Sequence, residues 1–133
     1  MDKAKFRAMF LAEAAEHLQD MSETLVRLDH DPGNRQDIDA LFRAAHSIKG
    51  MAATMDFQQT ARLAHHLEDG LDQSRQRGKI SAAEIDQLLA AVDLLEALLE
   101  DIRMGQPERD VAFFIADAVD AAVMENDPEE GNA

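Results

Sequence analysis

Residues 41–50 read LFRAAHSIKG, near the middle of a chain of 133 residues. Around this stretch, apolar residues recur at the spacing of one helix face; they are Ile38, Leu41, Phe42, Ala45, Ile48, Ala52 and Met55. At about 100° per residue, His46 falls roughly 130° from the centre of that face. The pattern therefore predicts a helix that is anchored along one side and carries a histidine on its flank, outside the core.

Two neighbours of His46 indicate what this histidine handles. Lys49 and Gly50 follow it on the next turn of the same surface. A glycine inside a helix costs about 1 kcal/mol relative to alanine, so its presence suggests that something bulky approaches the backbone there. The Lys49 ammonium is placed to offset negative charge that arrives at His46. A histidine, a nearby cation and a cleared patch of backbone suit the handling of a phosphoryl group.

The composition is typical of one helical domain. Alanine, leucine and acidic residues are frequent, whereas β-branched and aromatic residues are sparse. The chain has no cysteine, which leaves neither a disulfide framework nor a thiol nucleophile. It has no signal-peptide core and no apolar run of membrane-spanning length. We therefore expect a cytoplasmic protein without a membrane partner.

The charge is acidic and unevenly distributed. The formal net charge is −14, which argues against nucleic-acid binding, since that requires a basic surface. Residues 1–83 carry 13 acidic and 11 basic side chains, whereas residues 84–133 carry 14 and 2. An anionic ligand or an acidic partner could therefore approach the half of the chain that contains His46 without strong repulsion.

Five amphipathic segments, separated by turn and capping residues, predict an all-α fold. With their caps they cover residues 2–30, 34–55, 56–77, 81–102 and 107–122. The short connections favour an antiparallel bundle, with four helices in an up-down core and the fifth, C-terminal helix packed alongside. Residues 1–124 would form this domain. Residues 125–133 are acidic and lack an apolar stripe, which predicts a disordered tail or the start of a linker.

The helix starts carry recognisable capping residues. Asn34 is the expected N-cap of the second helix, and Gly78 is expected to end the third. The expected starts of the last three helices are Asp56 with Gln59 in a capping box, Ser81 with Glu84 in another, and Pro107 with Glu108 and Asp110 in the first turn.

A second polar cluster lies on the third predicted helix. His65 and Glu68 are three residues apart and share a face. If the second and third helices are antiparallel neighbours, His46, ten residues before Asp56, would lie near Glu68, twelve residues after it. A carboxylate that accepts a hydrogen bond from one imidazole nitrogen leaves the other nitrogen with a free lone pair. Such an imidazole is an activated nucleophile.

The pattern alone leaves other interpretations open. His46 and Lys49 would also suit an ordinary solvated helix face. Glu68 could be a solvated carboxylate, or it could pair with Arg62 or Arg75. His65 and His66 could join Glu68 and His46 in a metal site, although no HExxH motif or comparable pattern is present.

Two sequence blocks resemble the histidine-containing phosphotransfer (HPt) domains. The first runs from Phe42 to Gly50 as FRAAHSIKG, with Phe57 further on, and resembles the phosphorylation-site helix of these domains. It is most similar to the N-terminal domain of chemotaxis histidine kinases of the CheA type. The second block is matched by Ala61, Leu63, His65, Glu68, Leu71 and Asp72. Together with the five-helix outline, the resemblance covers about residues 2–124.

The resemblance implies a role for each matching residue. It implies that His46 is the phosphoacceptor and that Glu68 accepts a hydrogen bond from its Nδ1. Lys49 and His65 would be the neighbouring polar residues of the site, and Arg43 and Gly50 would lie on the partner surface.

It also implies the partners. A separate kinase domain would hold the ATP that phosphorylates His46, and a response regulator would receive the phosphoryl group on an aspartate. The chain has no glycine-rich phosphate cradle and no Mg²⁺-binding motif. We therefore expect it to hold no cofactor and to act as the phosphoacceptor domain of a kinase, not as a kinase alone.

Two alternatives remain at this stage. The chain could be a free-standing HPt protein of a multistep phosphorelay, or a helical interaction module without phosphotransfer. In each case we expect the domain itself to be monomeric.

Overall fold

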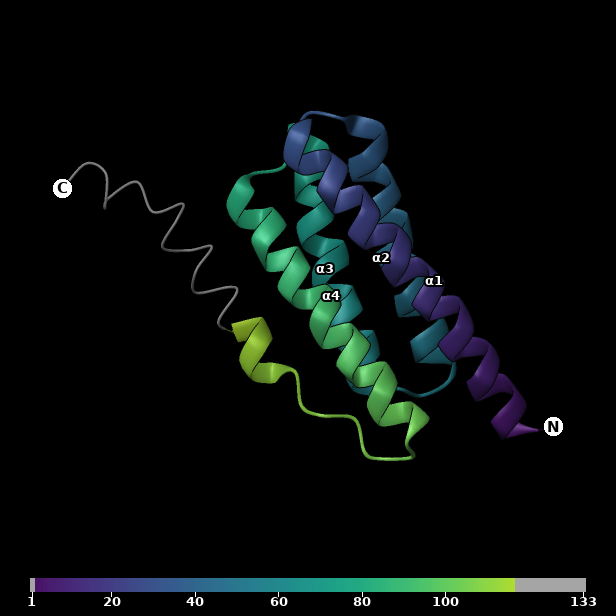
Figure 1. Ribbon diagram of the computed structural model, residues 1–133. Coiled ribbons are helices and arrows are strands. Elements are labelled where there is room, and N and C mark those ends of the chain that lie inside the picture. The colour runs from purple at the N-terminus through teal and green to yellow at the C-terminus, as the bar shows by residue number, and fades with distance from the viewer. Residues whose placement is uncertain (1, 117–133) are drawn as a thin grey trace.

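The computed structural model describes residues 2–116, which contain helices and connecting turns and no β-strand. Four long helices follow one another: α1 (Lys3–His30), α2 (Arg35–Thr54), α3 (Gln58–Arg77) and α4 (Ala82–Arg103). Successive helices run in opposite directions (Figure 1). The predicted all-α antiparallel bundle is confirmed. The end of the predicted fifth helix and the predicted tail at 125–133 lie outside the described residues.

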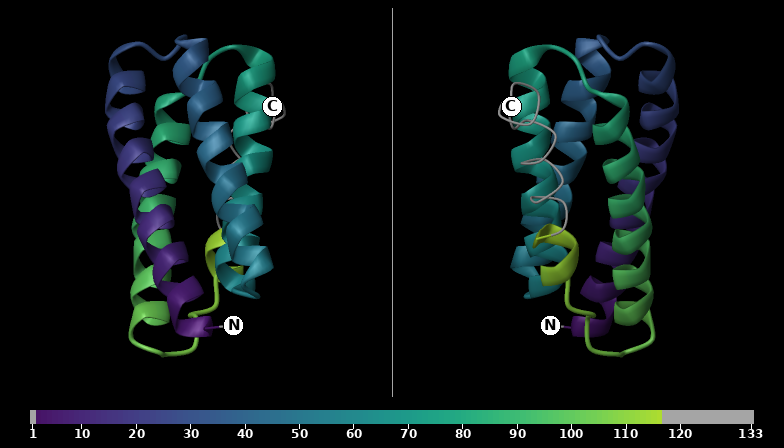
Figure 2. Two further views of the ribbon diagram at one scale, coloured as in Figure 1. Left: turned by 90° about the vertical axis from the view of Figure 1, so that its right-hand side faces the viewer. Right: turned by 90° about the vertical axis from the view of Figure 1, so that its left-hand side faces the viewer.

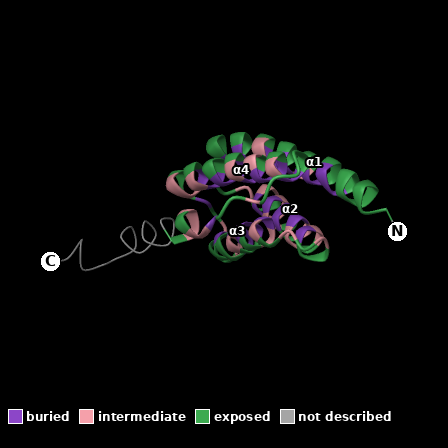
Figure 3. Cartoon of the chain, turned by 90° about the horizontal axis from the view of Figure 1, so that it is seen from below, coloured by how far each residue is buried: buried purple, intermediate pink, exposed green. Residues whose placement is uncertain are grey.

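Each long helix packs against two others around one core. The contact between α2 and α3 is the most extensive, α1 packs on α2 and α4, and α3 makes a smaller contact with α4. The residues coloured as buried lie on the helix faces turned toward the other helices, and the exposed residues lie on the outer faces (Figure 3). The fully buried core side chains include Met21, Leu25, Leu28, Ile38, Leu41, Ile48, Leu63, Leu71, Leu95 and Leu98. None of the helices in the described part of the chain combines the length and the apolar character needed to span a bilayer.

The local caps of α2 and α4 are as predicted. The Asn34 side chain accepts a hydrogen bond from the Asp37 N–H at 3.1 Å. Ser81 Oγ accepts from the Glu84 N–H at 3.1 Å, and the Glu84 carboxylate accepts from the Ser81 N–H at 2.9 Å. At the end of α3, Gly78 has φ +80°, the left-handed conformation that glycine adopts without steric cost.

The predicted cap of α3 is wrong. Asp56 has φ +63° and belongs to the turn between α2 and α3. The helix begins at Gln58, after Phe57, which makes no side-chain capping bond. Glu108 supplies the cap instead, because its Oε2 accepts from the Thr60 N–H at 2.8 Å and from the Thr60 hydroxyl at 2.6 Å. A carboxylate at a helix N-terminus satisfies free N–H groups and complements the helix dipole.

The predicted start of the fifth helix at Pro107 is also wrong. Residues 105–111 form no helix, and helical structure resumes over residues 112–116, after Asp110, which accepts from the Ala112 N–H at 2.9 Å. Arg109 bonds to the Asp101 carboxylate through Nε and Nη2, at 2.8 Å each, which holds the pKa of Asp101 below its usual range. The segment crosses to the N-terminal end of α3 (Figure 2), because Glu108 finds its hydrogen-bond donors there and not in a helix of its own.

This cap gives a first prediction. Glu108→Ala should lower the free energy of unfolding by about 1 kcal/mol, the typical cost of losing an N-cap. For a domain of this size that corresponds to a melting temperature lower by roughly 3–5 °C. Thermal denaturation followed by circular dichroism measures it. Glu96→Ala, at an exposed position of α4, is the matched control and should change the melting temperature little. An equal effect of the two substitutions would contradict the capping role.

Candidate phosphotransfer site

His46 lies on the outer flank of α2. The opposite face of the same helix is buried through Ile38, Leu41 and Ile48, whereas the His46 side chain is 64% exposed. The helix therefore fixes the position of the residue while its imidazole stays in reach of solvent and of a partner. This is the placement that the apolar periodicity predicts.

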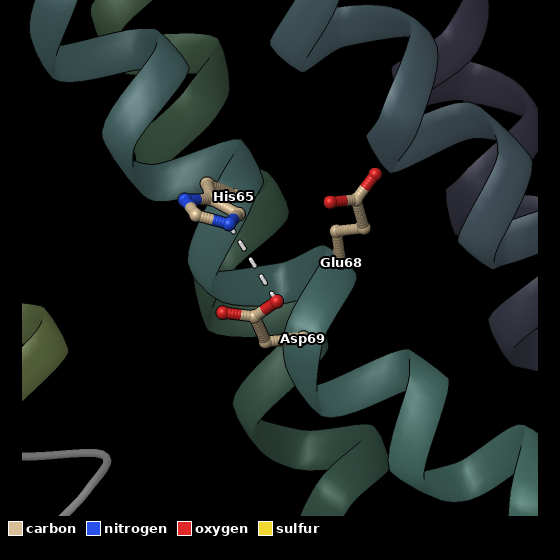
Figure 4. A group of neighbouring side chains, drawn as sticks. All are labelled: His65, Glu68 and Asp69. Atoms are coloured by element: carbon tan, nitrogen blue, oxygen red, sulfur yellow. Dashed lines mark ion pairs between the residues drawn. The ribbon is translucent and has the colours of Figure 1, made fainter.

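Glu68 approaches His46 from α3. Its side chain is only 11% exposed, and it points across to the neighbouring helix (Figure 4). Glu68 Oε2 is hydrogen-bonded to His46 Nδ1, and Glu68 Oε1 accepts from Lys49 Nζ at 2.7 Å. One nearly buried carboxylate thus holds the histidine and the lysine of α2 at the same time.

The electrostatics assign the proton on the imidazole. The hydrogen bond from Lys49 is the largest influence on Glu68 and lowers the pKa of its carboxyl group; burial opposes this, and the bond to His46 adds to it. Glu68 is therefore ionised at neutral pH and can only accept hydrogen bonds. It follows that Nδ1 of His46 carries the proton and donates, while Nε2 of the neutral ring keeps a free lone pair.

His65 does not join this hydrogen-bonded group. Its side chain is 60% exposed, and Nε2 lies 3.6 Å from Asp69 Oδ1 on the next turn of α3. Figure 4 shows His65 and Asp69 turned toward each other and Glu68 turned away from them. The neighbouring His66 is half-buried, and burial lowers its pKa.

One group of side chains in the described part of the chain has the spacing of a metal site. Ligand atoms of His65, Glu68 and Asp69 lie within 4.8 Å of one another. His66 is not part of the group, in contrast to the metal site considered from the sequence. Because Glu68 already binds Lys49 and His46, a metal ion would have to displace these two bonds. The contacts favour the carboxylate–histidine pair.

Arg43 and Gly50 border the histidine on the surface of α2. Arg43 is 68% exposed and pairs with Asp39. Gly50 is exposed, and a Cβ atom added there would meet no neighbouring atom within 4 Å. Packing within the bundle therefore does not require a glycine at this position. That Gly50 leaves the backbone open for a partner stays a prediction.

The structure adds two residues that the sequence pattern did not mark as part of the site. The Phe42 ring lies nearly parallel to the His46 ring, at an interplanar angle of 14° and a centroid distance of 6.3 Å. The Arg75 guanidinium carbon lies 4.0 Å from the centre of the Phe42 ring. The spacing of Phe42 and His46, one turn apart on α2, could have indicated the first contact. No pattern along the chain could have indicated the second.

Comparisons with known proteins agree with this geometry. The family model of the Hpt domain matches residues 5–105. Over 112 residues the chain is 40% identical to "Chemotaxis protein CheA" of Listeria monocytogenes, an alignment that covers 82% of this chain and 18% of that protein. It is 35% identical over 125 residues to "Chemotaxis protein CheA" of Halobacterium salinarum, covering 92% of this chain and 19% of that protein.

A solved structure has the same fold. The "CheA phosphotransferase domain from Thermotoga maritima" superposes with a TM-score of 0.73 at 35% sequence identity, and the match covers 77% of this chain and 98% of that one. The present chain thus corresponds to nearly all of that solved domain, while it spans about a fifth of the length of the curated relatives it matches.

The Lys49–Glu68 bond gives a second prediction. Lys49→Met should raise the pKa of Glu68, because it removes the largest influence that lowers it. A carboxyl group with a depressed pKa in the folded state stabilises the fold above its unfolded pKa, and this contribution disappears as the pH falls through the folded pKa. The stability difference between wild type and Lys49→Met should therefore be present at pH 7 and shrink in acid. Carboxyl carbon NMR titration and denaturation at several pH values measure the two effects; an unchanged Glu68 pKa would contradict the assignment.

Proposed function

Because the chain belongs to the Hpt domain family, we propose that it is the phosphotransfer domain of a CheA-type chemotaxis histidine kinase and that His46 is its phosphoacceptor. The observation that carries the proposal is the hydrogen bond between Nδ1 of an exposed histidine and an ionised, nearly buried glutamate. In the neutral imidazole this bond places the proton on Nδ1 and leaves the lone pair on Nε2, as a nucleophile requires.

In the first step Nε2 of His46 attacks the γ-phosphorus of ATP, which is held by a separate kinase domain. The new N–P bond forms as the bond from that phosphorus to the oxygen bridging to the β-phosphate breaks, and ADP leaves with the electron pair. Since Nδ1 keeps its proton, the imidazole ring becomes positively charged. Phosphoryl transfer depends mainly on the positioning of the reacting groups and on electrostatic stabilisation. No residue other than His46 has to form a covalent bond in this step.

Glu68 supports this step through Nδ1. Its negative charge stabilises the positive ring that forms, and a hydrogen bond to a charged acceptor is worth roughly 1.5–3 kcal/mol. Lys49 acts through the same carboxylate, because its Nζ lies 2.7 Å from Glu68 Oε1. It keeps Glu68 ionised and pointed at α2. This is a different role from the direct neutralisation of incoming phosphate that the sequence pattern suggested.

In the second step the phosphoryl group leaves for a response regulator. A carboxylate oxygen of the regulator's aspartate attacks the phosphorus, the N–P bond breaks, and its electron pair returns to Nε2. The ring is then neutral again with its proton still on Nδ1, ready for another cycle. His65 and Arg43, both exposed, are the polar residues that we expect a docked partner to meet.

The similarity to chemotaxis kinases favours this function over a free-standing phosphorelay protein. The relatives reported above are both CheA proteins, and the matched segment is about a fifth of their length. We therefore propose that the ATP-binding kinase domain lies outside the present residues.

The third prediction tests the phosphoacceptor. His46→Gln should abolish phosphorylation and alter stability little, because the side chain is exposed and a glutamine amide can still donate a hydrogen bond to Glu68. Incubation with CheA-type kinase domains and radiolabelled ATP measures the phosphorylation, and thermal denaturation measures the stability. His30→Gln, at the exposed end of α1, is the control and should be phosphorylated normally. A wild-type domain that no such kinase domain phosphorylates would favour the helical interaction module.

The fourth prediction concerns regiochemistry. Phosphorylation should occur on Nε2, because the hydrogen bond to Glu68 occupies Nδ1. Glu68→Gln should preserve the helical fold and slow phosphorylation by about tenfold or more, the rate equivalent of the roughly 1.5–3 kcal/mol that a charged hydrogen bond contributes. NMR of the ¹⁵N-labelled phosphorylated domain identifies the nitrogen through its coupling to phosphorus. Phosphate on Nδ1, or an unchanged rate in the variant, would remove Glu68 from the mechanism.

A further inference from the structure

We propose that Phe42 is a positioning residue for His46 and that Arg75 holds Phe42 in the orientation that this requires. The proposal rests on the proposed function and deepens it, since it concerns how the phosphoacceptor ring is presented to a phosphodonor. Its starting point is the nearly parallel pair of rings on α2, whose planes differ by 14°.

The bond to Glu68 does not by itself fix the direction of Nε2. The His46 side chain is 64% exposed, so the bond to Glu68 can open and let the ring move to another χ1 well. A side chain on a helix has two common χ1 wells, near about 180° and −60°, unless packing selects one. In-line attack needs the lone pair aligned with the bond that breaks. A second contact that restrains the imidazole therefore has a direct use in this reaction.

Phe42 is placed to provide that contact. It lies one turn before His46 on the same side of α2, and the 6.3 Å between ring centroids is within the range of about 4.5–7 Å in which aromatic rings interact. Phe42 is itself half-buried and packs against the hydrophobic core. The Phe42 ring is thus held by the core and presents an aromatic face to the exposed imidazole.

Arg75 in turn restrains Phe42. Its guanidinium carbon lies 4.0 Å from the centre of the Phe42 ring, the geometry of a planar cation stacked on an aromatic face. Arg75 Nε also lies 3.7 Å from Asp39 Oδ1, so the guanidinium forms an ion pair with α2 as well. Asp39 is bonded to Arg43 as well.

The register of the two helices explains why these contacts occur together. Glu68 and Arg75 are two turns apart on one face of α3, and His46 and Phe42 are one turn apart on α2. Because the helices are antiparallel, Glu68 meets the imidazole at its nitrogen while Arg75 meets the neighbouring ring at its face. The helix α3 thus holds the phosphoacceptor directly and also through Phe42.

NMR of the unphosphorylated domain tests the positioning itself. The variants are Phe42→Leu and Arg75→Gln, and the control is Arg27→Gln, a partly exposed arginine that also pairs with an aspartate, Asp37. Three-bond couplings report the χ1 distribution of His46. We expect one dominant well in the wild type and the control, and in the two variants averaging with the second common helical well, in which the Glu68 bond is broken. Averaging in the wild type, or one well in all four proteins, would overturn the proposal.

Kinetics with a CheA-type kinase domain and ATP test its consequence. Both variants should lower kcat by about twofold or more, since a ring released on a helix spreads over about two common wells, while KM for the domain stays constant. Arg75→Lys keeps the charge without the planar group and should restore part of the loss. An unchanged kcat, or a change confined to KM, would overturn the proposal.

A loss of His46 positioning can be distinguished from a loss of stability and from a failure of the proposed function. Phe42→Leu alters a half-buried residue and can lower stability, whereas Arg75→Gln alters a partly exposed one and keeps the test decisive. A wild-type domain that accepts no phosphate from any kinase domain would contradict the proposed function. The coupling constants would still decide whether Phe42 and Arg75 orient His46.

Discussion

The nearly buried carboxylate of Glu68 links the packing of the bundle to the chemistry of its surface. Burial of a charge is costly unless the charge is paired and hydrogen-bonded. Glu68 meets this requirement through Lys49 on one oxygen and His46 on the other. Both partners come from α2, so the site exists only when α2 and α3 are packed in this register. The extensive contact between these two helices is therefore a condition of the chemistry as well as of the fold.

The same arrangement divides the imidazole into a held atom and a free atom. Nδ1 is held by Glu68, while Nε2 keeps the lone pair that, in the proposed function, meets a kinase domain and a regulator in turn. A site built on rigid helices keeps its geometry between such encounters. The Phe42 ring, stacked beside the imidazole and covered by Arg75, extends this rigidity to a side chain that is otherwise largely exposed.

Features whose partners lie close in the chain could be predicted from the sequence. The caps at Asn34 and Ser81 and the helix end at Gly78 depend on residues within a few positions, and all three are present. The start of α3 shows the opposite case. Its cap is Glu108, 48 positions away from Thr60, and local pattern favoured Asp56 because that residue type caps helices well. Which of the two carboxylates, Asp56 or Glu108, caps α3 depends on where the later part of the chain passes. The local sequence pattern does not contain that information.

The sequence by itself determined the class of the fold and the face on which His46 lies, because helical periodicity fixes which side of a helix is buried. It also brought Glu68 near His46, since a short turn between antiparallel helices sets their register. Only the tertiary structure decided which neighbours pair. In the folded protein the Lys49 ammonium donates to Glu68 and does not extend into solvent, His65 pairs with Asp69, and the Arg75 guanidinium stacks on Phe42. Several partners lie within reach of each of these long side chains, and the choice among them depends on burial and on distances across helices, which periodicity does not specify.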